Sequence, residues 1–274
     1  MAGLFLALVA SCGAPPRPCP AAPSETTNAF VQTFRLHSTV LNEDRVVNVH
    51  VPPDYAKGTD RYAVLYALDG GTQEDFPHVA GVIDVSERNE VIRPLIVVGI
   101  ENTERRRDLV SATSLPEEQK IAPHAGGTDA FRRFLREELE PEIARRFRTS
   151  GETAVVGESF AGLFVLETLL EQPDLFDTYI AIDPSVWWNG GALVKSVPQR
   201  LPTWTATAPK RLFVATADYK ETQDGVDALM AALREVKPAQ LVATHEPFPS
   251  EHHSTIFPVA EVRAYRALFA APGK

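Results

Sequence analysis

The segment 154–170 limits most narrowly what this chain can fold into. Residues 154–156 are Ala-Val-Val, typical of a buried strand, and residues 160–170 form an apolar run that predicts a helix. Between them, at 157–162, lies Gly-Glu-Ser-Phe-Ala-Gly. A chain that passes from a strand into a helix through one serine must turn sharply, and the strained backbone there points the serine Oγ into a cleft. We therefore predict that Ser159 is a nucleophile on such a turn.

The residues that flank this turn must be small, because the positions two before and two after the serine approach each other closely. Here they are Gly157 and Ala161, so the usual G-x-S-x-G pattern is replaced by G-x-S-x-A. A match to this pattern alone is weak evidence, since a Gly-Glu-Ser string also occurs in ordinary turns. The flanking strand and helix favour the nucleophile interpretation.

The rest of the chain alternates strand-like and helix-like segments, which indicates a mostly parallel sheet covered by helices on both faces. Continuous apolar runs at 62–68 and 95–100 predict strands buried on both sides. We expect an α/β-hydrolase fold with about eight strands, formed by one domain over residues 29–274. Further strands are predicted at 30–39, 45–51, 153–156, 179–182, 212–216 and 241–244, and helices at 128–148, 160–170, 223–236 and 255–270. The segment 72–86 is expected to form a short helix or a structured loop.

Residues 1–28 differ from the domain in composition. An apolar stretch at 4–10 is too short to span a bilayer, and the following Val-Ala-Ser-Cys12 resembles a bacterial lipobox. The first three residues carry no positive charge, unlike an ordinary signal peptide. A Pro- and Ala-rich stretch then predicts an extended tether. We expect an exported protein, periplasmic or anchored to a membrane through lipidated Cys12; the alternative is an untargeted tail.

Charge and cysteine content exclude several classes of function. The chain has 27 basic and 36 acidic residues, a formal net charge of −9, and no basic stripe, so a nucleic-acid partner is not expected. Both cysteines, Cys12 and Cys19, precede the domain, which therefore has no disulfide, catalytic cysteine or cysteine metal site. We expect neither a cofactor nor a metal.

The partners of Ser159 should follow it in the order acid, then histidine, at the ends of later strands. The loop after the strand 241–244 contains His252 and His253, and spacing alone does not choose between them. The acid should follow the strand 212–216, where Asp218 and Glu221 both qualify. Such a carboxylate would orient the imidazole and stabilise its protonated form.

Two backbone amides are expected to form an oxyanion hole. One is the N–H of Phe160, the residue after the nucleophile, and the other comes from the loop after the third strand. That loop contains Gly70 and Gly71, and glycines let the backbone approach a substrate closely. We therefore predict the N–H groups of Gly71 and Phe160 as the donors.

Several runs together resemble the Putative esterase family of α/β hydrolases, which includes siderophore trilactone esterases and esterase D-like enzymes. In that family the histidine typically lies in E-x-H-x-S with a proline five residues later, which selects His253, with Thr255 in place of the serine. The family also commonly has S-P-S-x-W-W, where this chain has Asp183 first, and its members tolerate a weak or absent acid. The matching runs are YALDG at 66–70, VGIEN at 98–102, RDL at 107–109, the nucleophile run, DPSVWW at 183–188 and EHHST at 251–255 with a proline at 258.

The resemblance implies hydrolysis of a small-molecule or polysaccharide-linked ester, such as a siderophore lactone, a feruloyl or acetyl ester, or a small acyl ester. Trp187 and Trp188 are candidates for an aromatic wall against the substrate, although either could pack beneath the loop instead. Arg107 is a candidate contact for an anionic substrate, with pairing to Asp108 or Glu101 as the alternative.

Three other functions stay open. Gly-Glu-Ser-Phe-Ala-Gly resembles the Gly-Glu-Ser-Tyr-Ala-Gly of serine carboxypeptidases, although those enzymes are much longer and rich in disulfides. An acyltransferase would share the fold but would need a site that excludes water. A catalytically inactive surface-binding lipoprotein would need no intact set of serine, histidine and glycines, and this chain has one.

Overall fold

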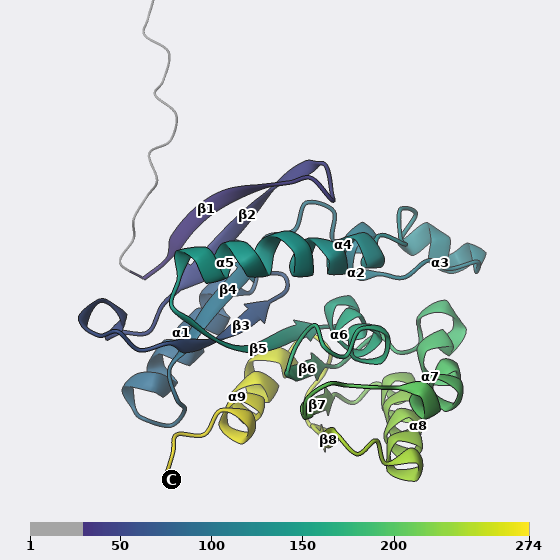
Figure 1. The fold of residues 1–274 in the computed structure, drawn as a ribbon. Coiled ribbons are helices and arrows are strands. Elements are labelled where there is room, and N and C mark those ends of the chain that lie inside the picture. The colour runs from purple at the N-terminus through teal and green to yellow at the C-terminus, as the bar shows by residue number, and fades with distance from the viewer. Residues whose placement is uncertain (1–29, 274) are drawn as a thin grey trace, which may run out of the picture.

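The computed structural model describes residues 30–273, which contain one eight-stranded sheet (Figure 1). The strand order is β1-β2-β4-β3-β5-β6-β7-β8, with β1 and β2 antiparallel to their neighbours and every other adjacent pair parallel. The sheet confirms the prediction of a mostly parallel sheet of about eight strands. The strands are β1 Gln32–Ser38, β2 Glu43–His50, β3 Tyr62–Ala67, β4 Leu95–Ile100, β5 Thr149–Glu158, β6 Thr178–Ile182, β7 Lys210–Thr216 and β8 Leu241–Pro247.

The alternation of side chains along each strand divides the core between the two faces of the sheet. In β3, Val64 and Tyr66 enter one apolar cluster, while Leu65 enters the other. Helices α1 and α9 cover the second cluster, and α4, α5, α6, α7 and α8 cover the first. All six residues of β3 and of β4 are buried, which explains why their sequences are continuously apolar.

The longer helices lie close to where the apolar periodicity predicts them. Three elements escaped the sequence prediction, α2, α3 and α7, because the first two are short and the third contains two glycines and a proline. The helices are α1 Phe76–Arg88, α2 Arg105–Leu109, α3 Pro116–Ile121, α4 Thr128–Phe134, α5 Glu140–Arg146, α6 Phe160–Glu171, α7 Trp188–Arg200, α8 Lys220–Val236 and α9 Ile256–Leu268.

The single helix predicted over 128–148 is divided by a π-helical stretch, Leu135–Leu139, between α4 and α5. The N–H of Glu140 donates to the carbonyl of Leu135, five residues earlier. Pro141 follows directly and has no N–H for the regular pattern. The apolar face nevertheless stays continuous, because Phe131, Leu135 and Ile143 are all buried in the same core cluster.

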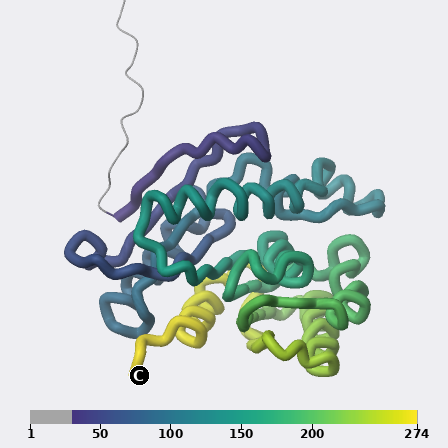
Figure 2. The backbone as a smooth tube through the Cα atoms, in the orientation of Figure 1, coloured from purple at the N-terminus to yellow at the C-terminus, as the bar shows by residue number. Residues whose placement is uncertain are grey.

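The end of the described chain closes against the region after α1. Ile92 and Ala270 form an isolated antiparallel bridge, and the N–H of Arg93 donates to the carbonyl of Phe269 at 2.8 Å. Figure 2 shows this yellow C-terminal segment beside the blue segment that contains α1. The two helices on this face, α1 and α9, are thereby joined at their C-terminal ends.

Because β5, β6 and β7 run parallel, the residues that follow them lie together at the edge of the sheet formed by the carboxyl ends of the strands. β5 ends at Glu158 directly before Ser159, and its neighbour β6 ends at Ile182 directly before Asp183. The loop from β8 to α9 returns to this edge and carries His253. The fold thus gathers residues from three separate parts of the sequence.

The predicted export segment and tether, residues 1–28 with Cys12, lie outside the described residues. Within residues 30–273, no helix combines the length and the apolar character that a membrane crossing requires.

Candidate active site

Ser159 occupies the turn between β5 and α6 in a strained backbone conformation of positive φ, with φ 60° and ψ −119°. Its N–H donates to the carbonyl of Ile182 at 3.0 Å, which ties the turn to β6. A Cβ at Gly157 would lie 2.7 Å from both the carbonyl carbon and the Cβ of Ala161, closer than real Cβ contacts come. The strained turn therefore requires a glycine two positions before the serine and a small residue two positions after it.

His253 links Ser159 to a buried carboxylate. Its Nε2 lies 3.1 Å from Ser159 Oγ, and its Nδ1 lies 2.6 Å from Oδ2 of Asp183. Because an ionised carboxylate only accepts hydrogen bonds, Nδ1 carries the proton and Nε2 is left to accept one from Ser159. The hydrogen bond to Asp183 raises the pKa of His253, and burial opposes this increase.

Asp183 is held firmly in this position. Its side chain is 1% exposed, and Oδ1 accepts a hydrogen bond from the N–H of Ala217 at 2.9 Å, just beyond β7. The same residue has a left-handed φ of 40°. One carboxylate oxygen is therefore fixed by the backbone, and the other is directed at the imidazole.

The structure contradicts the prediction that the acid follows β7. Asp218 contacts the other histidine, with Oδ2 at 2.6 Å from Nδ1 of His252, and the side chains of this pair are 44% and 72% exposed. Glu221 lies in the first turn of α8 with an exposed side chain, and no hydrogen bond or ion pair joins it to either histidine. The carboxylate that reaches His253 comes instead from the end of β6. The signal in the sequence was Asp183, where the resembling family commonly has serine.

The two predicted oxyanion donors differ in their surroundings. The N–H of Phe160 opens α6 and makes no hydrogen bond to any of residues 30–273. The N–H of Gly71 donates to Oε2 of Glu74 at 2.7 Å, so this amide already has an acceptor. Glu74 is itself held by the side-chain amide of Asn102 at 2.9 Å. Gly71 can serve as a donor only if Glu74 moves away.

Several carboxylates lie near Glu158, the residue that precedes Ser159. Arg105 binds Asp69 through two hydrogen bonds of 2.6 and 2.7 Å and also reaches the carbonyl of Glu158 at 3.3 Å. The side chains of Glu158 and Asp75 accept no hydrogen bond from the described residues. Burial, with the neighbouring carboxylates, raises the pKa of Glu158 to about 7, against an opposing effect of His253, and raises that of Asp75 to about 6.

Two of the three residues predicted to bind substrate make contacts with other parts of the protein. Trp188 is buried, and its indole N–H donates to the carbonyl of Ser111 at 2.8 Å. Arg107 pairs with Glu43 and Asp108, both at 2.7 Å, and is not available to an anion. For both residues the structure supports the stated alternative to substrate contact, because Trp188 packs in the core and Arg107 pairs with Asp108. Trp187 is half-buried with its ring 5.9 Å from that of Phe160, so it remains a candidate wall.

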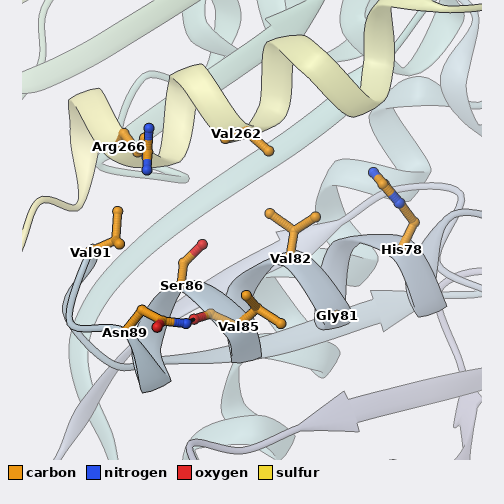
Figure 3. A pocket seen from close by; sticks show the side chains of 9 residues that line it. All are labelled: His78, Gly81, Val82, Val85, Ser86, Asn89, Val91, Val262 and Arg266. Carbon is orange, nitrogen blue, oxygen red and sulfur yellow. Dashed lines mark hydrogen bonds between the residues drawn. The ribbon is translucent and has the colours of Figure 1, made fainter.

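A separate apolar cavity of about 750 Å³ lies between α1 and α9 (Figure 3). Val82, Val85 and Gly81 of α1, Val262 of α9 and Val91 of the loop after α1 line it, with His78 toward one end and Arg266 toward the other. None of Ser159, His253 and Asp183 lines it, so this cavity does not belong to the serine–histidine site.

The sheet order, the strained serine between β5 and α6 and the histidine before α9 together define the α/β-hydrolase fold. A model of the family described as Putative esterase matches residues 38–224. The chain is 30% identical over 267 residues to the ferri-bacillibactin esterase BesA of Bacillus subtilis (strain 168), which covers 88% of this chain and 91% of that protein. The chain therefore belongs to the Putative esterase family and is a carboxylic-ester hydrolase.

Solved structures agree with this assignment. An IroE-like serine hydrolase from Shewanella oneidensis has a TM-score of 0.80 at 29% identity, and the match covers 87% of this chain and 80% of that one. The siderophore hydrolase EstB from Aspergillus nidulans has a TM-score of 0.74 at 20% identity over 93% of this chain and 99% of its own, a likeness of fold.

Proposed function

We propose that this esterase acts through an acyl-enzyme intermediate, with Ser159 as nucleophile, His253 as general base and Asp183 as the orienting acid. The observation that carries the proposal is the continuous chain of contacts from Ser159 Oγ to His253 Nε2, at 3.1 Å, and from His253 Nδ1 to Asp183 Oδ2, at 2.6 Å. This is the arrangement of a serine, a base and an acid that polarises the base.

The proposed reaction has two halves. Ser159 Oγ attacks the ester carbonyl while its proton passes to His253 Nε2, and the departing alcohol takes that proton as its bond to the acyl carbon breaks. Water then attacks the acyl-enzyme, again losing its proton to His253, which returns it to Ser159 Oγ. The N–H of Phe160, free of any described acceptor, donates to the carbonyl oxygen as negative charge builds there.

For the substrate we propose a siderophore ester. The support comes from the relatives, which carry the names ferri-bacillibactin esterase and siderophore hydrolase. The His253 side chain is 54% exposed, so the reacting end of the site is open to a substrate larger than a simple acyl ester. Feruloyl, acetyl and small acyl esters are the alternatives that the assay below compares.

The experiment measures hydrolysis of short p-nitrophenyl esters, of siderophore lactones and of feruloyl esters by the purified protein and by Ser159→Ala. We expect turnover and covalent labelling by a fluorophosphonate for the natural protein and neither for the variant. An unlabelled, inactive natural protein would overturn the mechanism. Activity on peptides without activity on esters would instead support a peptidase, and acyl transfer to an added alcohol in preference to water would support an acyltransferase.

For residues 1–28 we propose export with lipidation of Cys12, on the strength of the lipobox-like run. Mass spectrometry of the protein from a bacterial host, with and without the signal-peptidase inhibitor globomycin, tests it. An unmodified Cys12 on the intact chain would rule lipidation out.

A further inference from the structure

A second serine stands beside the nucleophile. Ser185 follows Asp183 by two residues, and its Oγ lies 3.3 Å from the Oγ of Ser159. The residue is 4% exposed, and its hydroxyl has no other hydrogen-bond partner among residues 30–273. Buried polar groups normally have hydrogen-bond partners, so the position of the Ser185 hydroxyl against the Oγ of Ser159 calls for a physical explanation.

The backbone fixes Ser185 in this place. Its N–H donates to the carbonyl of Ser159 at 3.0 Å, and its own carbonyl accepts from the N–H of Trp188 at 3.0 Å. A Cβ at Gly162 of α6 would lie 3.1 Å from the Cα of Pro184, so the helix and this segment are in close contact. None of these contacts involves the Ser185 hydroxyl, whose only described neighbour for a hydrogen bond is therefore the nucleophile.

The direction of the hydrogen bond follows from the protons available. The hydroxyl of Ser159 has one proton, and the neutral imidazole of His253 must accept it at Nε2 because Nδ1 donates to Asp183. Ser159 Oγ then has lone pairs left, and the proton of Ser185 is the donor that faces them. In the state that is ready to react, Ser185 donates and Ser159 accepts.

We propose that Ser185 is a catalytic residue whose hydroxyl donates a hydrogen bond to Ser159 Oγ, stabilising the negative charge on that oxygen as it attacks and as it departs. During attack the Oγ–carbon bond forms, the Ser159 proton goes to His253, and the carbonyl electron pair moves to the carbonyl oxygen. During deacylation the same bond breaks, its electron pair returns to Oγ, and His253 returns the proton. The Ser185 proton is shared throughout and is never transferred. The inference rests on the proposed function of Ser159.

A hydrogen bond to a group that becomes charged contributes more than one between neutral groups, so its loss should slow each half-reaction about 10- to 100-fold. Both halves should slow, because the charge on Ser159 Oγ appears in attack and again in departure. A residue that served only to pack the loop would instead change substrate affinity or stability.

The test compares Ser185→Ala with the natural protein in three measurements. The first is the rate constant for fluorophosphonate labelling. The second is the rate constant of the initial burst of p-nitrophenol, which reports acylation, and the third is the steady rate after the burst, which reports deacylation. We expect all three to fall about 10- to 100-fold, with KM for acylation and the thermal midpoint little changed. Ser196→Ala is the matched control, because it removes a hydroxyl that donates only to the carbonyl of Leu193 in α7.

A folded Ser185→Ala variant with natural rates of labelling and deacylation would overturn the proposal, as would a loss confined to KM. If the alanine variant does not fold, Ser185→Cys replaces the hydroxyl with a weaker donor of similar shape. We then expect labelling clearly slower than that of the natural protein, and equal rates would refute the role. Labelling of the natural protein but not of Ser159→Ala secures the proposed function separately, so the two hypotheses can fail independently.

Discussion

Asp183 brings a buried carboxylate to His253 from the end of β6, at a position where the resembling esterases commonly have serine. Its two oxygens have different partners, the N–H of Ala217 and the imidazole of His253. The arrangement fixes both the orientation of the ring and the position of its proton. A single side chain thus distinguishes this site from a serine–histidine pair without an acid.

Replacing Asp183 with asparagine should lower kcat/KM by roughly 10²- to 10⁴-fold. The amide oxygen can still accept from Ala217, but its NH₂ then faces Nδ1 of His253 and favours the tautomer with a proton on Nε2, which cannot act as base toward Ser159. Steady-state kinetics on a p-nitrophenyl ester measures the loss. Asp218→Asn is the control and should leave the rate unchanged; a large loss in Asp218→Asn would place the acid after β7 after all.

Glu158 directly precedes Ser159. The hydrogen bond with Asp183 is the main cause that raises the pKa of His253, and the ionised form of Glu158 adds to it, whereas burial and Arg105 lower this pKa. The pKa of Glu158 itself is raised to about 7 by burial and by Asp75, Asp183 and Asp69, against the effect of His253. Its charge therefore changes in the same pH range in which the base must be neutral.

We expect Glu158→Gln to move the acidic limb of the kcat/KM–pH profile to lower pH. Removing the negative charge makes the imidazolium less stable, so His253 loses its proton at lower pH and is available as base there. A pH profile of ester hydrolysis from about pH 5 to pH 9 measures the direction of the shift. A limb that moves upward would contradict the assignment of His253 as the titrating group.

At the scale of elements, the turn between β5 and α6 depends on close contact of its two flanks. The register of β5 and β6 pairs Glu158 with Ile182, so the serine and the acid emerge from adjacent strand ends. The N–H of Ser159 also donates to the carbonyl of Ile182. A change that separates β5 from α6 should therefore disturb the serine and the carboxylate together.

Gly157→Ala is expected to destabilise the protein by about 1–3 kcal/mol and to abolish most activity, because its Cβ would lie 2.7 Å from backbone and side-chain atoms of Ala161. Gly81→Ala in α1 is the matched control. Its Cβ meets no atom within 4 Å, and alanine in a helix is about 0.5–1 kcal/mol more favourable than glycine. Denaturant unfolding and ester hydrolysis of both variants make the comparison. Equal stability of the two would show that the turn can relax.

At the scale of the whole molecule, three carboxyl groups are buried or half-buried and form no ion pair with an arginine or lysine of the described residues. Burial raises the pKa of Glu87 to about 8 and those of Glu140 and Glu167 to about 7. A pKa above the ordinary value of 4.5 means that folding favours the protonated form. The stability from these groups is present below pH 4.5 and is lost as the pH rises through the folded-state pKa values, between about 7 and 8.

We therefore expect the free energy of unfolding to fall between pH 5 and pH 8, and Glu87→Gln to recover part of the loss. The glutamine oxygen can keep the hydrogen bond from the N–H of Leu95, at 2.7 Å, without burying a charge. The variant should equal the natural protein at pH 5 and be about 1–3 kcal/mol more stable at pH 8. Urea unfolding at both pH values tests this, with the exposed Glu117→Gln as control. A Glu87→Gln protein that gains nothing at pH 8 would show that the carboxyl stays solvated.

Local patterns were sufficient to predict most of the fold. The central strands are apolar throughout because both faces are covered, and the long helices carry an apolar face of helical period, so both are visible in the sequence. The short α2 and α3 and the glycine-containing α7 carry too few periodic positions to be recognised. The π-helical stretch before Pro141 shows no change in apolar pattern and could not be predicted either.

The sequence by itself determined the position of Ser159 on a strained turn. Such a turn between a strand and a helix needs small residues two positions before and two positions after the serine, and the sequence shows them directly. It also limited the histidine to two neighbours in one loop. Only the tertiary structure decided that Asp183 contacts His253 while Asp218 contacts His252. It also decided that the side chains of Trp188 and Arg107 bind other parts of the fold. The contact between Ser185 and the hydroxyl of Ser159 likewise appears only in the folded chain. The physical reason is that these contacts join the ends of different strands. Their distances depend on sheet register and loop packing, which no local pattern encodes.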